Sequence, residues 1–179
     1  NETDLFKDNQ EDHKELFKNT KSVLINNSTL KPIYTQYNNI IGNKDALKEL
    51  GKADWNNVVV EKSYEGTMLV LYYHNDKWNL STRRCIDASN SKWIYGLSYY
   101  DMFMESIKTK FKLEDLNEKY CYHFVLVHYK NINIINYREF GPNYKEVIHT
   151  MTTEKDTCLE VNYTINKNVK TPEKLNYKN

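Results

Sequence analysis

Residues 61–93, EKSYEGTMLVLYYHNDKWNLSTRRCIDASNSKW, hold two runs of β-forming residues separated by a short polar segment. The first run extends from Met68 to Tyr73 and the second from Trp78 to Thr82. Two such runs across a short polar loop are typical of an antiparallel hairpin. The hairpin would bring Glu65, at its start, close to Arg83, at its end. Charges fixed on strand ends suit a phosphorylated ligand, and a surface hairpin with charged ends is the simpler interpretation.

The remaining patterns predict a single α+β domain, a mostly antiparallel sheet with flanking helices. Its 179 residues divide into a helical and loop region, 1–57, and a core, 58–179. Asn43 and Ser98 are the expected helix caps, and Gly51 the expected end of a short helix. The predicted helices are 3–24 (at its shortest 3–20), 44–50, 98–111 and 113–119. The predicted strands are 58–62, 67–73, 77–83, 121–128, 132–137 and 159–165, with 144–151 a strand or a short helix.

The composition argues against several classes of protein. The net charge of +1 does not indicate a general nucleic-acid binder, and no apolar run approaches the roughly 18 residues of a membrane span. The three cysteines form no C-x-x-C pair, so neither a disulfide framework nor a zinc site is predicted. We therefore expect an intracellular protein with no membrane partner and no metal held by histidine or cysteine. The locally basic C-terminal tail is either solvated or contacts RNA or an acidic protein.

Taken in order, these segments resemble the nucleotidyltransferase domain of the RNA-ligase group of covalent nucleotidyltransferases. That superfamily also includes DNA ligases and mRNA capping enzymes. The resemblance, to ligase-like proteins of phages and large DNA viruses, covers about Lys62 to Tyr177. Its most specific part is EGTMLVLYYHNDKWNLSTRRCIDASNSKW, similar to a family stretch with EGT, a hydrophobic strand, GKW, ST-x-R, DA and S-x-W. LSYYDMF, YCYHFVLVHYKNINII and NVKTPEKLNYK stand where the family has its later motifs.

The resemblance implies a chemistry and a set of site residues. In the family, a lysine attacks the α-phosphate of ATP to form lysyl-AMP with the help of a divalent metal, and the AMP passes to a 5′-phosphate end of RNA. ATP and Mg²⁺ would be the cofactors if activity is retained. For Phe124 core packing is the alternative to stacking on a purine, and for Arg83 and Arg84 it is plain surface charge. The nucleotide-binding residues implied are Glu65, Arg83, Asp101, Phe124, Glu154 and Lys170, expected in one cleft.

The sequence departs from the family pattern at the groups that this chemistry uses. Counting back from Glu65-Gly66, the nucleophile position holds Ser63, and the lysine is one place earlier, at Lys62. On a strand, an offset of one residue turns a side chain to the opposite face unless a bulge re-aims it. Other departures are Tyr100-Asp101 for Gly-Glu, Val125 for a frequent acid, Glu154-Lys155 for Glu-Gly, and Asn168 for the first lysine of the final motif.

These departures predict a ligase-like domain that has lost catalysis and serves as a structural or binding module. The resemblance to proteins of phages and large DNA viruses implies a viral origin. We expect a protein partner or self-association, with RNA as a further candidate, in the cytoplasm, a virus factory or a virion. The alternative is an active ATP-dependent RNA ligase that uses Lys62 as its nucleophile; otherwise Lys62 is an exposed strand-edge lysine. A third interpretation is an unrelated α+β binding module whose hairpin match is accidental.

Overall fold

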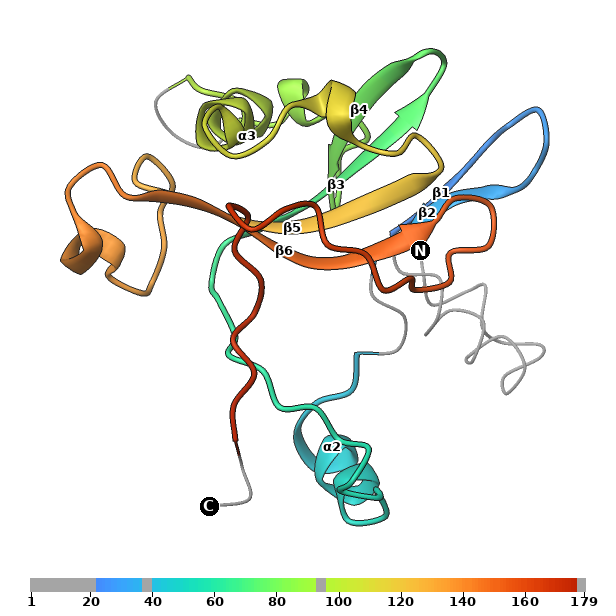
Figure 1. The fold of residues 1–179 in the computed structure, drawn as a ribbon, viewed down its shortest axis with the longest axis vertical. Coiled ribbons are helices and arrows are strands. Elements are labelled where there is room, and N and C mark those ends of the chain that lie inside the picture. The colour runs from blue at the N-terminus through green and yellow to red at the C-terminus, as the bar shows by residue number, and fades with distance from the viewer. Residues whose placement is uncertain (1–21, 37–39, 93–95, 177–179) are drawn as a thin grey trace, which may run out of the picture.

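A four-stranded antiparallel sheet forms the centre of the molecule (Figure 1). The structure is a computed structural model that describes residues 22–36, 40–92 and 96–176. The α+β class is confirmed, as are the 67–83 hairpin and the strand at 121–128; the segment 144–151 belongs to a strand. In the order β4-β3-β5-β6, the strands are Lys77–Thr82, Thr67–His74, Tyr120–His128 and Lys145–Glu154.

The β3–β4 hairpin closes on the two-residue turn Asn75-Asp76. These residues have φ angles of 52° and 58°, the left-handed conformation that suits the twist of a tight hairpin. Asn and Asp adopt it more readily than other non-glycine residues. Beyond the turn, the alternation of β3 sends Leu69 and Leu71 to one face of the sheet and Val70 to the other.

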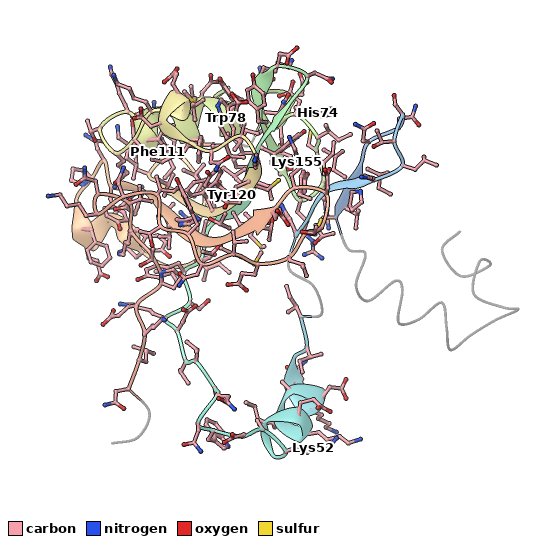
Figure 2. All side chains as sticks on the ribbon, turned by 45° about the vertical axis from the view of Figure 1, so that its right-hand side comes forward. Lys52, His74, Trp78, Phe111, Tyr120 and Lys155 are labelled. Carbon is pink, nitrogen blue, oxygen red and sulfur yellow. The ribbon has the colours of Figure 1, made fainter. Side chains whose placement is uncertain are left out.

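Helix α3 (Tyr99–Ile107) covers the face that carries Leu69 and Leu71 (Figure 1). Phe111, labelled in Figure 2, belongs to the hydrophobic cluster between this helix and the strands, and Trp78, also labelled, packs against that cluster. The helix ends at Ile107, not at 111 as predicted, because the chain turns sharply: the carbonyl of Ile107 accepts from the amides of Lys110 (2.7 Å) and Phe111 (3.3 Å). This turn buries Phe111 in the core. The helix predicted over 113–119 is reduced to a 3₁₀ turn, Leu113–Asp115.

The opposite face of the sheet is covered by a small antiparallel pair, β1 (Val23–Ile25) and β2 (Pro32–Thr35). Ile33 and Tyr34 pack there against Val70, Tyr72 and Cys121. The helix predicted over 3–24 falls mostly outside the described residues. Its last residues are wrong, because Val23 and Leu24 pair with β2.

Three of the predicted strands do not form as predicted. Residues 58–62 lie outside the sheet and pair with the C-terminal tail, through the bridge Glu61–Lys174. Residues 132–137 form a loop followed by the 3₁₀ turn η3 (Tyr137–Phe140), and Ile134 is 95% exposed, so this alternating segment has no sheet to pack on. Residues 159–165 follow the edge of β6 through a single bridge, Thr153–Glu160, which leaves less of that edge unpaired.

Helix α2 (Asn43–Leu50) confirms the predicted helix at 44–50 and its end at Gly51, which is the C-cap, but the predicted N-cap, Asn43, is wrong. Gly42 is the N-cap, without a side-chain hydrogen bond, and Gly51 has a right-handed φ of −65°. None of the helical residues is buried. The helix lies well apart from the sheet in Figure 1, and Lys52, just beyond it, is far from Phe111 in Figure 2. Within the described ranges, no helix is long and apolar enough to cross a membrane.

Candidate functional site

The segment that leads into β3 carries Lys62, the nucleophile of the alternative hypothesis. The Lys62 amide donates to the carbonyl of Glu173 at 2.8 Å, and the Lys62 Nζ lies 3.9 Å from a Glu173 carboxylate oxygen. The same ammonium lies 6.0 Å from the centre of the Tyr64 ring, and the Lys170 ammonium lies 4.8 Å from it. Both lysines thus lie near the Tyr64 ring, close to where the C-terminal tail pairs with the segment before β3.

Glu65 contacts a different part of the chain, the loop between β5 and β6. Its two carboxylate oxygens accept hydrogen bonds from the consecutive amides of Ile134 (2.8 Å) and Ile135 (2.6 Å). The Tyr137 hydroxyl lies 3.0 Å from the amide nitrogen of Glu65 and donates to its carbonyl oxygen at 2.9 Å. Hydrogen bonds to an ionised carboxylate are stronger than neutral ones. Glu65 therefore fixes this loop against the start of β3.

Gly66 has a steric reason to be glycine. A Cβ built on it would lie 2.4 Å from the backbone oxygen of Leu126 and 2.8 Å from a methyl of Val125. Both atoms belong to β5, which is paired on two sides and cannot move away. The Glu-Gly step of the resemblance thus has structural roles in this chain, a loop contact at Glu65 and close strand approach at Gly66.

A pocket of about 440 Å³ opens where β3 begins and β4 ends. Its lining includes three cations, Arg83, Arg84 and Lys92, together with hydroxyl-bearing side chains. Among the described residues, no carboxylate forms an ion pair with any of these cations. We call it the basic pocket; its lining is Gly66, Thr67, Met68, Thr82, Arg83, Arg84, Ser91, Lys92 and Tyr99.

Asp101 caps helix α3. Its carboxylate accepts from the hydroxyl (2.6 Å) and amide (3.1 Å) of Ser98, while the Asp101 amide donates to the Ser98 oxygen at 3.0 Å. The hydrogen bond from the Ser98 hydroxyl, with help from the backbone amide and the charge of Lys92, holds the pKa of Asp101 below its usual range. This reciprocal capping box confirms Ser98 as the predicted cap.

Phe124 lies in the aromatic core and is 1% exposed. Its ring is surrounded by Phe103, Phe111 and His149, with centroids 5.2, 6.0 and 5.5 Å away. The placement matches the core-packing alternative, because no face of the ring is open to a ligand.

The structure does not bring the six implied residues into one cleft. Arg83 lines the basic pocket, and Lys170 approaches Tyr64, next to Glu65. Glu154 pairs with Tyr120 at the far end of β5, whereas Thr67, two residues after Glu65, pairs with Leu126. Glu154 accepts there from the Thr157 hydroxyl at 2.9 Å.

Sequence reasoning missed a second pocket, of about 420 Å³, in the loop that follows β5. The signal was present in YKNINIINYR, where a tyrosine and a basic residue stand at each end of a run of asparagine and isoleucine. Because residues 132–137 were predicted to form a strand, no pocket was expected in this segment. We call it the tyrosine pocket; its lining is His128, Tyr129, Lys130, Asn131, Ile132, Asn133, Ile134, Ile135, Asn136, Tyr137, Arg138, Gly141 and Tyr144.

Part of this chain is similar to viral proteins of known name. It is 34% identical over 91 residues to an RNA ligase of Rhodothermus phage RM378, over 45% of this chain and 20% of that protein. It is also 34% identical over 61 residues to an immediate-early protein ICP-46 homolog of Invertebrate iridescent virus 3, over 34% of this chain and 13% of that protein. The chain thus spans a fifth or less of each relative. No protein-family profile matches it.

The acids do not gather as oxygen ligands for the divalent metal that the resemblance implies. Glu65 is bound to two amides, Asp101 caps a helix, and Glu154 lies at the other end of the sheet. Within the described part of the chain, no group of three His, Cys, Asp or Glu residues could hold a metal ion. The described features instead combine cations, hydroxyl groups and aromatic rings at one end of the β3–β4 hairpin.

Proposed function

We propose that this chain is a ligase-like domain that binds the phosphates of single-stranded RNA and forms no lysyl-nucleotide intermediate. The observation that carries the proposal is the basic pocket, where Arg83, Arg84 and Lys92 converge on the hairpin end. Among the described residues no carboxylate forms an ion pair with these three cations, and guanidinium and ammonium groups are donors that phosphate oxygens attract. RNA is the favoured phosphate source because one viral protein that is similar to part of this chain is named an RNA ligase.

The absence of lysine transfer is supported by the contacts of the groups that the reaction would need. Ser63 stands at the nucleophile position, and a serine hydroxyl there has no adjacent general base in the sequence. Lys62 pairs with Glu173 through both backbone and side chain. Phe124 is enclosed by other rings.

One observation favours the alternative, an adenylyltransferase that uses Lys62. Lys62 and Lys170 share the ring of Tyr64, which places a second cation near the first. In the family, the final motif supplies lysines that neutralise the triphosphate, and Lys170 keeps one of these positions. Covalent labelling by ATP separates this alternative from the proposal.

Binding of single-stranded RNA at several salt concentrations tests the proposal. The variant Arg83→Ala/Lys92→Ala removes two positive charges from the basic pocket, and Lys44→Ala/Lys48→Ala removes two from helix α2 as a matched control. We expect the pocket variant to bind at least tenfold more weakly and to lower the slope of log K against log salt by about 1.4, because each phosphate contact contributes about 0.7. The control should match the wild type. Equal losses in both variants, or no binding by the wild type, would contradict the proposal.

A further inference from the structure

The tyrosine pocket and the basic pocket are neighbours. Asn131 lines the first and Thr67 the second, and the Asn131 Nδ2 donates to the Thr67 Oγ1 at 3.0 Å. An RNA strand whose phosphates are bound by Arg83, Arg84 and Lys92 would therefore lie beside the tyrosine pocket. The volume of that pocket, about 420 Å³, falls in the range of small-ligand sites.

Its lining combines flat rings with amide groups and cations. The Tyr144 ring packs on Tyr137, with centroids 5.9 Å apart and planes at 22°, and on Phe140 at 5.1 Å. Desolvation by burial raises the pKa of Tyr144, so its hydroxyl stays protonated. Tyr129 stacks on His128 at 4.6 Å, with the Lys130 ammonium 5.3 Å from its ring. Rings that are already packed lose little freedom when a ligand stacks on them.

The loop that forms this pocket is held in shape from outside it. The two carboxylate oxygens of Glu65 accept hydrogen bonds from the backbone amides of Ile134 and Ile135 in the loop. The Tyr137 hydroxyl makes two hydrogen bonds with the backbone of Glu65. Glu65 thus acts as a positioning residue for the pocket. A concavity fixed in this way is available before any ligand arrives.

We propose that the tyrosine pocket binds an unstacked base of the RNA strand whose phosphates the basic pocket holds. This inference rests on the proposed function. Splayed bases of single-stranded RNA stack on tyrosine rings and accept hydrogen bonds from amide side chains, and both groups line this pocket. The pocket also holds Lys130 and Arg138, which suit the phosphates on either side of a bound base. A protein partner that contacts the exposed Ile132 and Ile134 is the alternative occupant.

Two oligomers of equal length separate the base contact from the phosphate contact. One is hexa-adenylate RNA, and the other is a ribose-phosphate hexamer without bases. We expect the wild type to bind hexa-adenylate roughly 5- to 150-fold more tightly than the abasic hexamer, since a single stacked base contributes affinity of that order. Tyr144→Ala should remove this preference and leave affinity for the abasic hexamer unchanged. Tyr144→Phe, which keeps the ring, should retain it.

Equal affinity of the wild type for both hexamers would overturn the inference. It would leave the phosphate contact of the proposed function unchanged and would favour a protein as the ligand of the exposed isoleucines. A preference that persists in Tyr144→Ala would also overturn the inference. Binding of neither hexamer would refute the proposed function itself. A hexamer with 2-aminopurine in place of adenine tests the wild type without any variant: its fluorescence should change on binding, because the base leaves its stack with neighbouring adenines for the tyrosine rings, and constant fluorescence at saturation would contradict this binding mode.

Discussion

The ring of Phe111 lies almost parallel to that of Phe124, with centroids 6.0 Å apart and 8° between the planes. Phe124 is the residue that the resemblance places against a purine, and in this chain it is 1% exposed. Phe103 and His149 contact the same ring. A base could reach Phe124 only if this aromatic core opened, which is why we place base binding in the loop after β5.

Replacing Phe111 by alanine should lower the free energy of unfolding by about 3 kcal/mol, because it removes a core ring and leaves a cavity. For a chain of this length the loss corresponds to a Tm lower by about 6–12 °C, measurable by calorimetry. Phe140→Ala is the control, since Phe140 is 61% exposed and should cost less than about 1 kcal/mol. An unchanged Tm for Phe111→Ala would contradict this packing.

Gly66→Ala should be destabilising by about 1–3 kcal/mol, because the new methyl would meet the Leu126 carbonyl at 2.4 Å. Gly42→Ala is the matched control: a Cβ there has nothing within 4 Å, and its φ of −141° is open to any residue. Urea unfolding of the two variants measures the difference. Equal midpoints would show that β5 yields at this contact.

Most of the fold was predictable because its signals are local. The β3–β4 hairpin has two β-forming runs and a turn of Asn and Asp, and helix α3 begins at a capping serine. The failures come from long-range partners. Residues 58–62 have strand composition, but pair with a tail more than a hundred residues away. The alternating residues 132–137 were predicted to be a strand because the nearby sequence does not show that the amides of Ile134 and Ile135 donate to Glu65.

The site was predictable only in part, for the same reason. Arg83 and Gly66 meet in one pocket because a hairpin joins them. The position of Glu154 depends on the register of β6 on β5, which no short motif encodes. A protein partner or self-association stays a prediction from the sequence.

Lowering the pH should destabilise the folded chain at pH values well above those at which carboxylates titrate. Burial lowers the pKa of His123 to about 3 and of His149 to about 4, from an ordinary value of 6.5. The unfolded state binds these protons first, so the stability contributed by the neutral rings is complete above pH 6.5. It falls as the pH drops from 6.5 towards 4 and 3, the folded values. Burial lowers the pKa of His128 as well, which adds to the trend.

At pH 5.5 the cost is about 1.4 kcal/mol for each of His123 and His149. Urea unfolding at pH 7.5 and 5.5 should therefore differ by about 3 kcal/mol or more. His149→Gln should remove about 1.4 kcal/mol of that difference. Identical stabilities at the two pH values would mean that these rings are not buried as described.

Glu65→Gln should loosen the loop after β5 without unfolding the sheet. The amide side chain offers a single neutral acceptor where the carboxylate offers two charged ones, so one of the Ile134 and Ile135 amides loses its partner. Hydrogen exchange followed by NMR should show at least one of these amides exchanging tenfold or more faster. Glu154→Gln, at the other end of the sheet, should leave both rates unchanged. Equal rates in Glu65→Gln and the wild type would contradict the role of Glu65.

The central claim about the chemistry of this chain is that it does not form lysyl-AMP. An intact-mass spectrum of the protein after incubation with ATP and Mg²⁺ or Mn²⁺ tests it most directly. We predict a single mass, that of the unmodified chain, for the wild type and for Lys62→Ala alike. A species heavier by one AMP in the wild type, lost in Lys62→Ala, would contradict the claim and make this chain an adenylyltransferase.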